Sequence, residues 1–268
     1  MAEAHATAQD GNNGSSGTAL RGTGLAGQPE VRAVLRVVEL GVDAAAGARV
    51  RRIQPALKRT LDVLISAVVL ALALPVMAVI ALAIVIESPG GVLYRAERVG
   101  RNGRPLRMFK FRKMRRDAAG VPLTTAHDPR FTPVGALLAR TKLDELPQLI
   151  NVLRGDMSLI GPRPEDAAFV ATRRLEFSEI LTVRPGITGP SQIAFAQEAR
   201  ILSADDPVAD YVERILPQKC RLDRMYVRSR SLRTDLRILI WTSAAVIGRR
   251  QVAVHRDTGR MSLRDRRR

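Results

Sequence analysis

Two adjacent carboxylates, Asp144 and Glu145, are the residues of this sequence that best fit a role in chemistry. They lie near the start of TKLDELPQLINVLRGDMSLIGPRPE, residues 141–165, in a chain whose formal net charge is +17. Apolar residues with helical spacing follow them: Leu146, Leu149, Ile150 and Leu153. Gly155 is a typical helix end. The spacing therefore predicts a helix that begins beside the acidic pair.

An acidic pair at a helix start has two interpretations. In a structural role, Asp144 caps the helix and Glu145 adds negative charge to its first turn. In a chemical role, the same helix end attracts a phosphate, while a divalent cation screens the two carboxylates from each other. A carboxylate can then attack phosphorus and form an acyl phosphate. The residues of this segment leave both roles open.

Three cations elsewhere are candidates for holding such a phosphate. Lys110 lies between two phenylalanines in MFKFRKM, and apolar surroundings strengthen the attraction of an ammonium for phosphate because they exclude water. Arg163 lies between two prolines in GPRPE, which is a rigid setting for a guanidinium that binds phosphate as a fork. Arg184 opens the turn-rich segment RPGITGPSQ, which could line a phosphate path or be a tight structural connection.

The composition indicates an anionic partner. The chain has 268 residues, 46% of them hydrophobic, and a sequence pI near 11.4, which favours nucleic acid, a phospholipid surface or a phosphorylated substrate. Aromatic residues make up only 4% of the chain and offer few stacking platforms for bases. A non-enzymatic, membrane-anchored basic protein that binds anionic lipid or nucleic acid remains an alternative, but it gives the acidic pair no function.

A long apolar segment, Leu61–Ile86, predicts an element that enters a membrane. After Asp62 it contains no charged residue until Glu87. Its length would allow it to span the hydrocarbon layer, but Pro75 lies at its middle and both flanks are basic. We therefore expect a re-entrant hairpin bent at Pro75, with both flanks on the cytoplasmic side, rather than a single span.

The remaining segments give simpler expectations. The glycine-containing stretch after the apolar segment predicts two short strands around a turn, followed by a basic patch. His127 and Asp128 fit a turn better than a metal site. Residues 232–247 predict an amphipathic helix at the membrane interface. Residues 1–50 predict a disordered tail, although part of 31–57 has the pattern of a short helix, and 249–268 a basic tail.

Five segments, in order, resemble the bacterial sugar transferases that make polyprenyl-diphosphate-linked sugars, the monotopic phosphoglycosyl transferases. These are KRTLDVLISAVVLALALP, ESPGGVLYRAERVGRNGRPLRMFKFRKM, DPRFTPVGALL, LDELPQLINVLRGDMSLIGPRPE and RPGITGPSQI. The resemblance covers about residues 58–248. It implies a re-entrant membrane helix, Mg²⁺ as cofactor, and transfer of a phospho-sugar from a UDP-sugar to polyprenyl phosphate through a covalent intermediate.

The resemblance also implies roles for individual residues. Asp144 would be the nucleophile and the Mg²⁺ ligand, with Glu145 as its acidic partner, and Lys110 and Arg163 would contact phosphate. The family commonly has arginine five residues before the nucleophile; that place is Ala139 here, and we expect Arg140 to replace it. Many members also have Ser-Pro where this chain has Leu-Pro at Pro75, which removes a hydroxyl that could satisfy the freed backbone.

Together these patterns predict a mostly helical α/β monotopic protein in one domain, residues 51–248. Within it we expect the re-entrant helix at 58–87, a catalytic core with a small β-hairpin at 88–200, and a C-terminal amphipathic segment at 201–248. The expected location is the cytoplasmic face of a bacterial cell membrane, in contact with anionic lipid and without nucleic acid. The resemblance leaves a homodimer and the identity of the sugar open.

Overall fold

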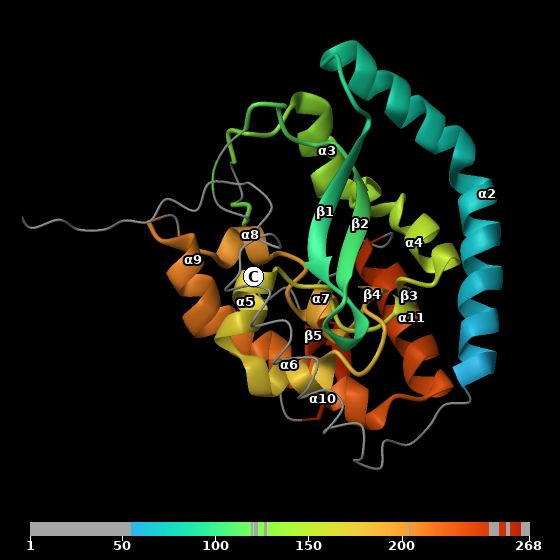
Figure 1. The fold of residues 1–268 in the computed structure, drawn as a ribbon, viewed down its shortest axis with the longest axis vertical. Coiled ribbons are helices and arrows are strands. Elements are labelled where there is room, and N and C mark those ends of the chain that lie inside the picture. The colour runs from blue at the N-terminus through green and yellow to red at the C-terminus, as the bar shows by residue number, and fades with distance from the viewer. Residues whose placement is uncertain are drawn as a thin grey trace, which may run out of the picture.

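The computed structural model describes residues 55–118, 120, 123–125, 128–203, 205–246, 252–255 and 258–263. The expected disordered tail, 1–50, and the helical pattern before Pro55 lie outside the described residues. The described part combines many helices with three small two-stranded sheets. A mostly helical body lies beside one long helix, α2, which follows the edge of the molecule (Figure 1).

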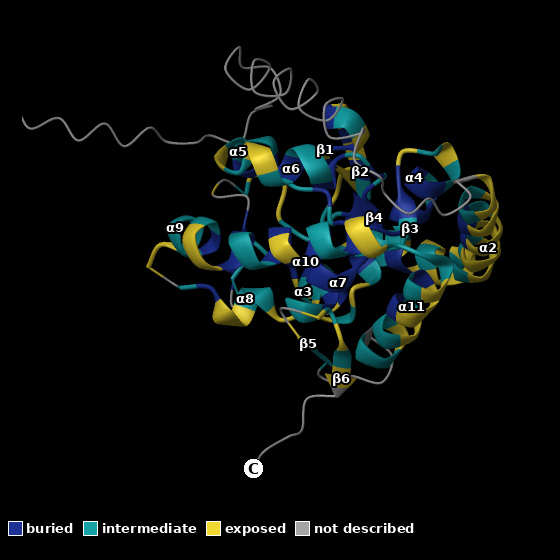
Figure 2. Ribbon diagram, turned by 90° about the horizontal axis from the view of Figure 1, so that it is seen from below, coloured by how far each residue is buried: buried dark blue, intermediate teal, exposed yellow. Residues whose placement is uncertain are grey.

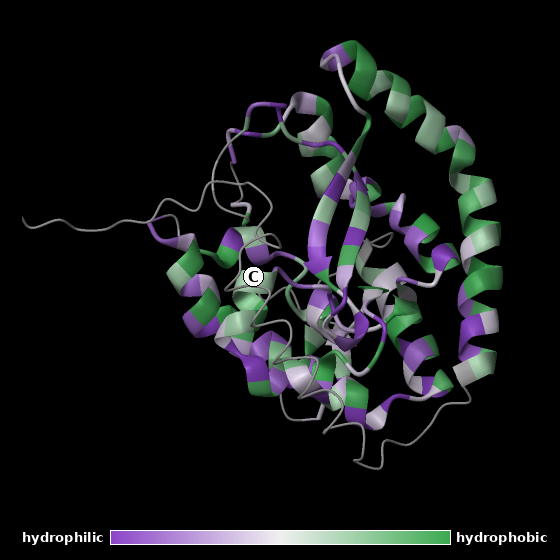
Figure 3. Cartoon of the chain, viewed as in Figure 1, coloured by the Kyte–Doolittle hydropathy of each residue, from purple (hydrophilic) through white to green (hydrophobic). Residues whose placement is uncertain are grey.

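Helix α2, Pro55–Glu87, contains the apolar segment. It is the one described helix long and apolar enough to cross a membrane, and only 11% of its most apolar window is buried. Its outer face is exposed and hydrophobic along most of its length (Figures 2 and 3). Pro75 lies inside an unbroken helix that curves around the body (Figure 1). The structure thus contains a continuous curved helix where the sequence predicts two arms folded back on each other.

Both ends of α2 are attached to the same body. Near its start, Arg59 donates to the carbonyl oxygens of Val152 and Leu153, at 2.6 and 3.1 Å. At its end, the Glu87 carboxylate accepts a 2.8 Å hydrogen bond from the backbone of Val134, in the first turn of α3, Pro133–Thr141. The long helix therefore begins and ends against one surface, and a straight crossing would separate those two attachments.

The predicted hairpin is present as strands β1, Leu93–Val99, and β2, Pro105–Phe111. They pair antiparallel, so that Tyr94 lies opposite Lys110. Asn102 takes a left-handed conformation in the 3-10 turn Arg101–Gly103 that joins them, a conformation that asparagine tolerates better than most residues. The inner face of the hairpin buries apolar side chains in one cluster: Ala96, Leu106, Met108, Val152 and Met157.

A second small sheet joins two loops that the sequence singles out. Strand β3, Ser158–Ile160, runs parallel to β4, Gly186–Thr188. Immediately beyond β3, a Cβ at Gly186 would lie 2.1 Å from the backbone nitrogen of Gly161, so the two chains meet backbone to backbone. Glycine is needed at position 186 for close approach rather than for an unusual backbone angle, which favours the structural interpretation of the RPGITGPSQ segment.

The other described elements form the helical body. They are the 3-10 turn Leu143–Glu145, α4 Gln148–Arg154, α5 Ala167–Thr172, α6 Arg174–Ile180, α7 Pro190–Ala194, α8 Glu198–Ile201, α9 Pro207–Asp210, the π turn Tyr211–Ile215, α10 Leu216–Ser229 and α11 Leu232–Val246. The largest apolar cluster lies among α5, α6 and α10, where Val170, Phe177 and Leu216 are buried.

The C-terminal segment agrees with the sequence in one part and differs in another. Helix α11 buries Ile238 but exposes Leu236 and Ile240, which is the amphipathic pattern predicted for 232–247. The range expected to be a basic tail, 249–268, instead contains strands β5, Val252–Val254, and β6, Met261–Leu263, paired antiparallel. Three apolar side chains from these strands pack on the cluster that contains Ile238, which gives this short hairpin a buried face: Val252, Val254 and Met261.

Candidate active site

The acidic pair lies in a tight turn between two helices. Lys142 ends α3 in a left-handed conformation, with φ of 62°, and Asp144 and Glu145 follow in the 3-10 turn. Helix α4 begins only at Gln148, after Pro147, and no side chain caps it. The helix predicted to start beside the carboxylates therefore starts slightly later. The capping role for Asp144 finds no hydrogen bond to support it.

Apolar contacts with α2 hold this turn in place. Leu143 and Leu146, which flank the two carboxylates, pack in a cluster with Ile80 and Ile84 of α2. The two faces of α2 therefore have different roles. The outer face is exposed, and the inner face packs directly against the acidic turn.

Asn151 of α4 attaches the acidic turn to the β-hairpin. Its Oδ1 accepts a 2.9 Å hydrogen bond from the backbone of Phe109, and its Nδ2 donates at 2.8 Å to the carbonyl of Arg107. Because Asn151 is fully buried and satisfies two groups of one strand, it fixes the position of β2 relative to α4. No local sequence pattern predicts this contact.

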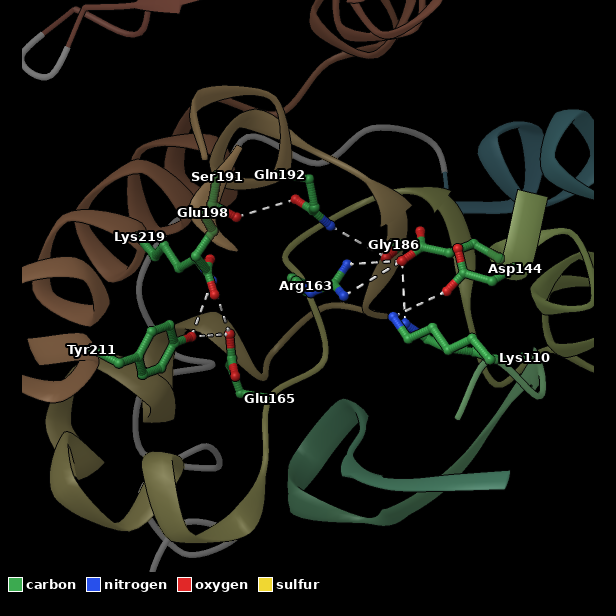
Figure 4. A network of polar contacts seen from close by, with 12 residues as sticks. Lys110, Asp144, Arg163, Glu165, Gly186, Ser191, Gln192, Glu198, Tyr211 and Lys219 are labelled. Carbon is green, nitrogen blue, oxygen red and sulfur yellow. Dashed lines mark hydrogen bonds and ion pairs between the residues drawn. The ribbon is translucent and has the colours of Figure 1, made fainter. Parts of the chain in front are cut away.

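Lys110, Glu145 and Arg163 meet as the structure closes around this turn. Lys110 Nζ lies 3.2 Å from Glu145 Oε1, and both terminal nitrogens of Arg163 lie 3.5 Å from the same oxygen (Figure 4). Lys110 is 8% exposed although it is charged. These three residues, predicted from separate motifs, form one site.

The electrostatics of this group follow from burial among opposite and like charges. Burial is the main cause that lowers the pKa of Lys110 to about 8; Arg163 and Lys113 act in the same direction, and Glu145 opposes them. Burial disfavours an ionised Glu145, but Lys110 and Arg163 outweigh it and lower the pKa of that carboxyl below its usual range. The carboxylate stays charged, and Lys110 is a cation that can lose its proton just above neutral pH.

Asp144 has one paired and one unpaired oxygen. It is 2% exposed, its Oδ2 lies 3.4 Å from Lys113 Nζ, and its Oδ1 is buried without a hydrogen-bond partner. Lys113 was missed by the sequence reasoning, although it belongs to the same MFKFRKM motif as Lys110. Gly135 lets α3 approach the backbone of Lys113, because a Cβ there would lie 1.9 Å from its carbonyl oxygen.

The donor set fits Mg²⁺ bound jointly with a substrate. No group of three or more metal-ligating side chains occurs among the residues that the structure describes, so a cage made only of protein ligands is absent there. Mg²⁺ is usually bound by one or two carboxylates together with substrate phosphates and water. The free Oδ1 of Asp144, with Glu145 beside it, meets that requirement.

The loop that carries Arg163 is fixed from both sides. Gly161 donates to Thr188, and Gly186 donates to the carbonyl of Pro162, at 2.9 and 2.8 Å. On the far side of Arg163 from the acidic turn, Figure 4 shows a second polar group. It consists of Glu165, Glu198, Tyr211 and Lys219. Burial opposes the charge on Arg163, yet Glu145, Glu165 and Glu198 raise the pKa of its guanidinium.

Two predicted phosphate contacts are not brought to this site. Arg140 is exposed in the last turn of α3 and forms no ion pair with Asp144 or Glu145. Arg184 donates to the carbonyl of Gly155 and lines a separate cavity near the start of α2.

The predicted turn at His127 and Asp128 can be followed in part. Asp128 forms a 2.6 Å ion pair with Arg130, two residues later, and accepts from the backbone of the same residue. These bonds are typical of a turn and occupy the carboxylate. His127 lies outside the described residues.

The buried Asp144, the partly buried Glu145 and two facing cations, built against an exposed apolar helix, fit a membrane-associated enzyme that handles phosphate. The family model described as Bacterial sugar transferase matches residues 53–249, and the chain belongs to this family. The expected resemblance is therefore confirmed.

Individual relatives agree with the family. A Caulobacter vibrioides protein named UDP-glucose:undecaprenyl-phosphate glucose-1-phosphate transferase is 38% identical over 195 residues, covering 71% of this chain and 69% of the relative. A Rhizobium leguminosarum protein named Exopolysaccharide production protein PSS is 37% identical over 202 residues, covering 72% and 96%. A Bacillus subtilis relative is 48% identical over 116 residues, 42% of this chain and 65% of the relative, so the chain spans less than two thirds of that protein.

Proposed function

We propose that this protein is a phosphoglycosyl transferase that moves a sugar-1-phosphate from a UDP-sugar to polyprenyl phosphate and releases UMP. The observation that carries the proposal is the buried Asp144, whose Oδ1 is free while Lys110, Glu145 and Arg163 lie together beside it. Relatives named as undecaprenyl-phosphate sugar phosphotransferases support the reaction class. The reaction is the first membrane step of exopolysaccharide or glycoconjugate synthesis.

In the first step, the free Oδ1 of Asp144 attacks the β-phosphorus of the UDP-sugar. A bond forms between that oxygen and phosphorus, and the bond from phosphorus to the bridging oxygen breaks. UMP leaves with the bonding electron pair, and the sugar phosphate stays on Asp144 as an acyl phosphate. Lys113, on the other oxygen of Asp144, orients the carboxylate for this attack.

In the second step, an oxygen of polyprenyl phosphate attacks the same phosphorus. The bond to Asp144 breaks, so the carboxylate is restored and the sugar is left on a polyprenyl diphosphate. Both steps exchange one phosphorus–oxygen bond for another and need no oxidant or reductant. A single nucleophile therefore serves both substrates in turn.

The remaining residues bind and orient phosphate. Lys110 and Arg163 present their positive charge toward one carboxylate oxygen of Glu145, and a phosphate at this point would share those donors. Glu145 holds the two cations ready while the substrate is absent. Mg²⁺, when held by Asp144, would neutralise phosphate charge, which would favour both attack by the nucleophile and departure of the leaving group.

The membrane position of the site follows from α2. Its exposed apolar face favours burial in hydrocarbon, while Arg59 and Glu87 attach its two ends to one body. We infer that the chain enters the cytoplasmic leaflet and returns to the same side, with the middle of the curved helix at its deepest point. Basic flanks on one side agree with the positive-inside preference and with anionic lipid.

The decisive experiment traps the intermediate. Purified protein incubated with Mg²⁺ and a panel of UDP-sugars, without lipid acceptor, should gain the mass of one sugar phosphate on the peptide that contains Asp144. Addition of polyprenyl phosphate should remove that mass. The sugar that gives the adduct is the substrate. Absence of both the adduct and UMP release across the panel would favour the non-enzymatic binding alternative.

A further inference from the structure

A cationic cavity of about 120 Å³ lies beside the start of α2. It is lined by residues from the long helix, the hairpin turn, β3, the loop before β4 and the junction of α10 with α11. The charged ones among them are Lys58, Arg59, Asp62, Arg101, Arg184 and Arg230. Since a water molecule occupies about 30 Å³ in the liquid, the space is large enough for one phosphate group.

Two of these cations already have partners. Lys58 forms ion pairs with Asp62 and Asp235, at 2.8 and 3.0 Å. Arg59 donates to the two carbonyl oxygens at the end of α4. Among the described residues that line the cavity, Asp62 has the one carboxylate, and it also accepts a hydrogen bond from Ser158, so its oxygens already have partners.

The other three cations, Arg101, Arg184 and Arg230, have no carboxylate partner among the described residues. Arg184 uses only its Nε, in a hydrogen bond to Gly155. Arg230 Nε is buried without any hydrogen-bond partner. Arg101 is exposed at the edge of the cavity. Partial desolvation lowers the pKa of its guanidinium, and the nearby positive charges of Arg184 and Arg230 lower it further. Three guanidinium groups that line one cavity without a counter-ion repel each other, and the buried Arg230 Nε is left unsatisfied.

Each of the three arginines is held in place by the fold. Asn102 donates its backbone N–H to the carbonyl of Leu181, which fastens the hairpin turn that carries Arg101 against the loop that leads to Arg184. Arg230 is the C-cap residue of α10 and directly follows its last residue, Ser229. The three backbones that carry these charges are thus held around one cavity.

We propose that this cavity binds a phosphate group, carried either by a lipid headgroup or by a soluble phosphate compound. Phosphate oxygens accept several hydrogen bonds at once, and guanidinium groups match them in a planar fork. Such an anion would satisfy Arg230 Nε and remove the repulsion among the three arginines.

This site is separate from the one at Asp144. Pro105 begins β2 next to the turn that carries Arg101, and Lys110 lies five residues further along the same strand. Five residues correspond to about 17 Å along a strand. The cavity lies instead where the charged start of α2 gives way to its apolar segment. With α2 inserted as proposed, that level coincides with lipid headgroups. The inference does not depend on the transferase reaction.

The test compares ligand-dependent stability in the whole protein. Protein in neutral detergent, without divalent cation, is titrated with sodium pyrophosphate or with phosphatidic acid, and with phosphatidylcholine as a neutral lipid. The midpoint of thermal unfolding reports binding, because a ligand of the folded state raises it. The variant is Arg101→Gln/Arg230→Gln. The control is Arg224→Gln/Arg228→Gln, which removes two charges of α10 that pair with Glu179 outside the cavity.

We expect phosphatidic acid, pyrophosphate or both to raise the unfolding midpoint of the natural protein, with no rise for phosphatidylcholine. A response to the lipid alone identifies a headgroup site, and a response to pyrophosphate alone identifies a soluble ligand. The cavity variant should bind at least about tenfold more weakly and should unfold at a higher temperature without ligand, because repulsion is removed. No response of the natural protein, or equal losses in both double variants, would overturn the proposal.

Discussion

Lys113 Nζ lies 3.4 Å from Oδ2 of Asp144, while Oδ1 of the same carboxylate has no hydrogen-bond partner. One oxygen is thus restrained and the other is free, inside a site where the residue is 2% exposed. A buried and unpaired carboxylate oxygen costs free energy of folding unless something compensates for it. Its presence beside phosphate-binding cations is the feature that the proposed chemistry explains.

Asp144→Asn separates chemistry from stability. The amide keeps the size of the side chain but is a poor nucleophile, so UMP release should fall to background. The free energy of unfolding should change by about 1 kcal/mol or less, since the loss of the ion pair with Lys113 is offset by removal of a buried charge whose Oδ1 has no hydrogen-bond partner. Turnover and urea unfolding measure the two quantities. Asp206→Asn, at a helix cap where asparagine serves as well, should change neither; substantial turnover by Asp144→Asn would contradict the mechanism.

Lys110 should set the alkaline limb of the pH profile. Its pKa is about 8, so it binds phosphate as a cation below that pH, and kcat/KM should decrease as the pH rises through about 8. The free energy of unfolding should instead increase as the pH rises between about 8 and 10.4, because the unfolded lysine there binds more protons than the folded one. Lys110→Arg should move the limb to higher pH. An unchanged limb in that variant would assign it to another group.

Arg163 should be needed for turnover rather than for folding. Its guanidinium reaches Glu145 through both terminal nitrogens, so Arg163→Ala removes a preorganised charge donor and should lower kcat/KM by on the order of 10² or more. Arg163→Lys should restore little, because an ammonium cannot form the fork. Arg173→Ala, which breaks an i, i+3 pair with Glu176, is the matched control and should retain full activity. Equal activities in the Arg163→Ala and Arg173→Ala variants would argue against a phosphate role.

Asn151→Ala should weaken both the fold and the site. Two hydrogen bonds between α4 and β2 are lost in a buried position, which should cost about 2 kcal/mol or more of unfolding free energy. Turnover should fall as well, because Lys110 loses its fixed position relative to Glu145. Asn151→Asp retains the acceptor for Phe109 but buries a carboxylate oxygen against the carbonyl of Arg107, so it should be at least as destabilising as Asn151→Ala. Unfolding in urea and UMP release provide the measurements.

The topology of α2 can be tested by labelling in cells. Single cysteines introduced at Ala56 and Glu97, both exposed, lie before and after the apolar segment, and the one natural cysteine, Cys220, is buried. Both introduced cysteines should be protected from a membrane-impermeant reagent in intact cells and should react after the cells are opened. Reaction of only one of them in intact cells would show a spanning helix.

Local patterns predicted the elements whose contacts are close in sequence. The run of apolar residues around Pro75 predicted α2, and the glycines between the two strands predicted the β1–β2 hairpin. The acidic pair, Lys110 and Arg163 were each identified from their immediate neighbours. That they meet in space followed only from the family resemblance, since Lys110 and Glu145 are 35 positions apart.

Contacts between distant segments were not predictable in this way. The pairing of Ser158 with Gly186 and the attachment of Asn151 to β2 depend on the packing of the whole body. Arg184 shows the same difficulty: its local setting was compatible with a phosphate path or with a tight structural connection, and only the structure places it, through its hydrogen bond to Gly155, beside a cavity separate from Asp144. The continuous course of α2 also depends on contacts along its length, which a proline alone does not reveal.

The two attachments of α2 fix the orientation of the enzyme as well as its location. Arg59 and Glu87 attach the helix to the body at both ends. With α2 inserted as proposed, the body therefore cannot rotate about a single attachment point or tilt away from the bilayer. The acidic turn, which packs directly on α2, then stays at a constant height above one leaflet. The lipid acceptor reaches it by diffusion in two dimensions, while the nucleotide sugar arrives from three. Turnover would accordingly follow the number of acceptor molecules per unit membrane area rather than their concentration per unit volume.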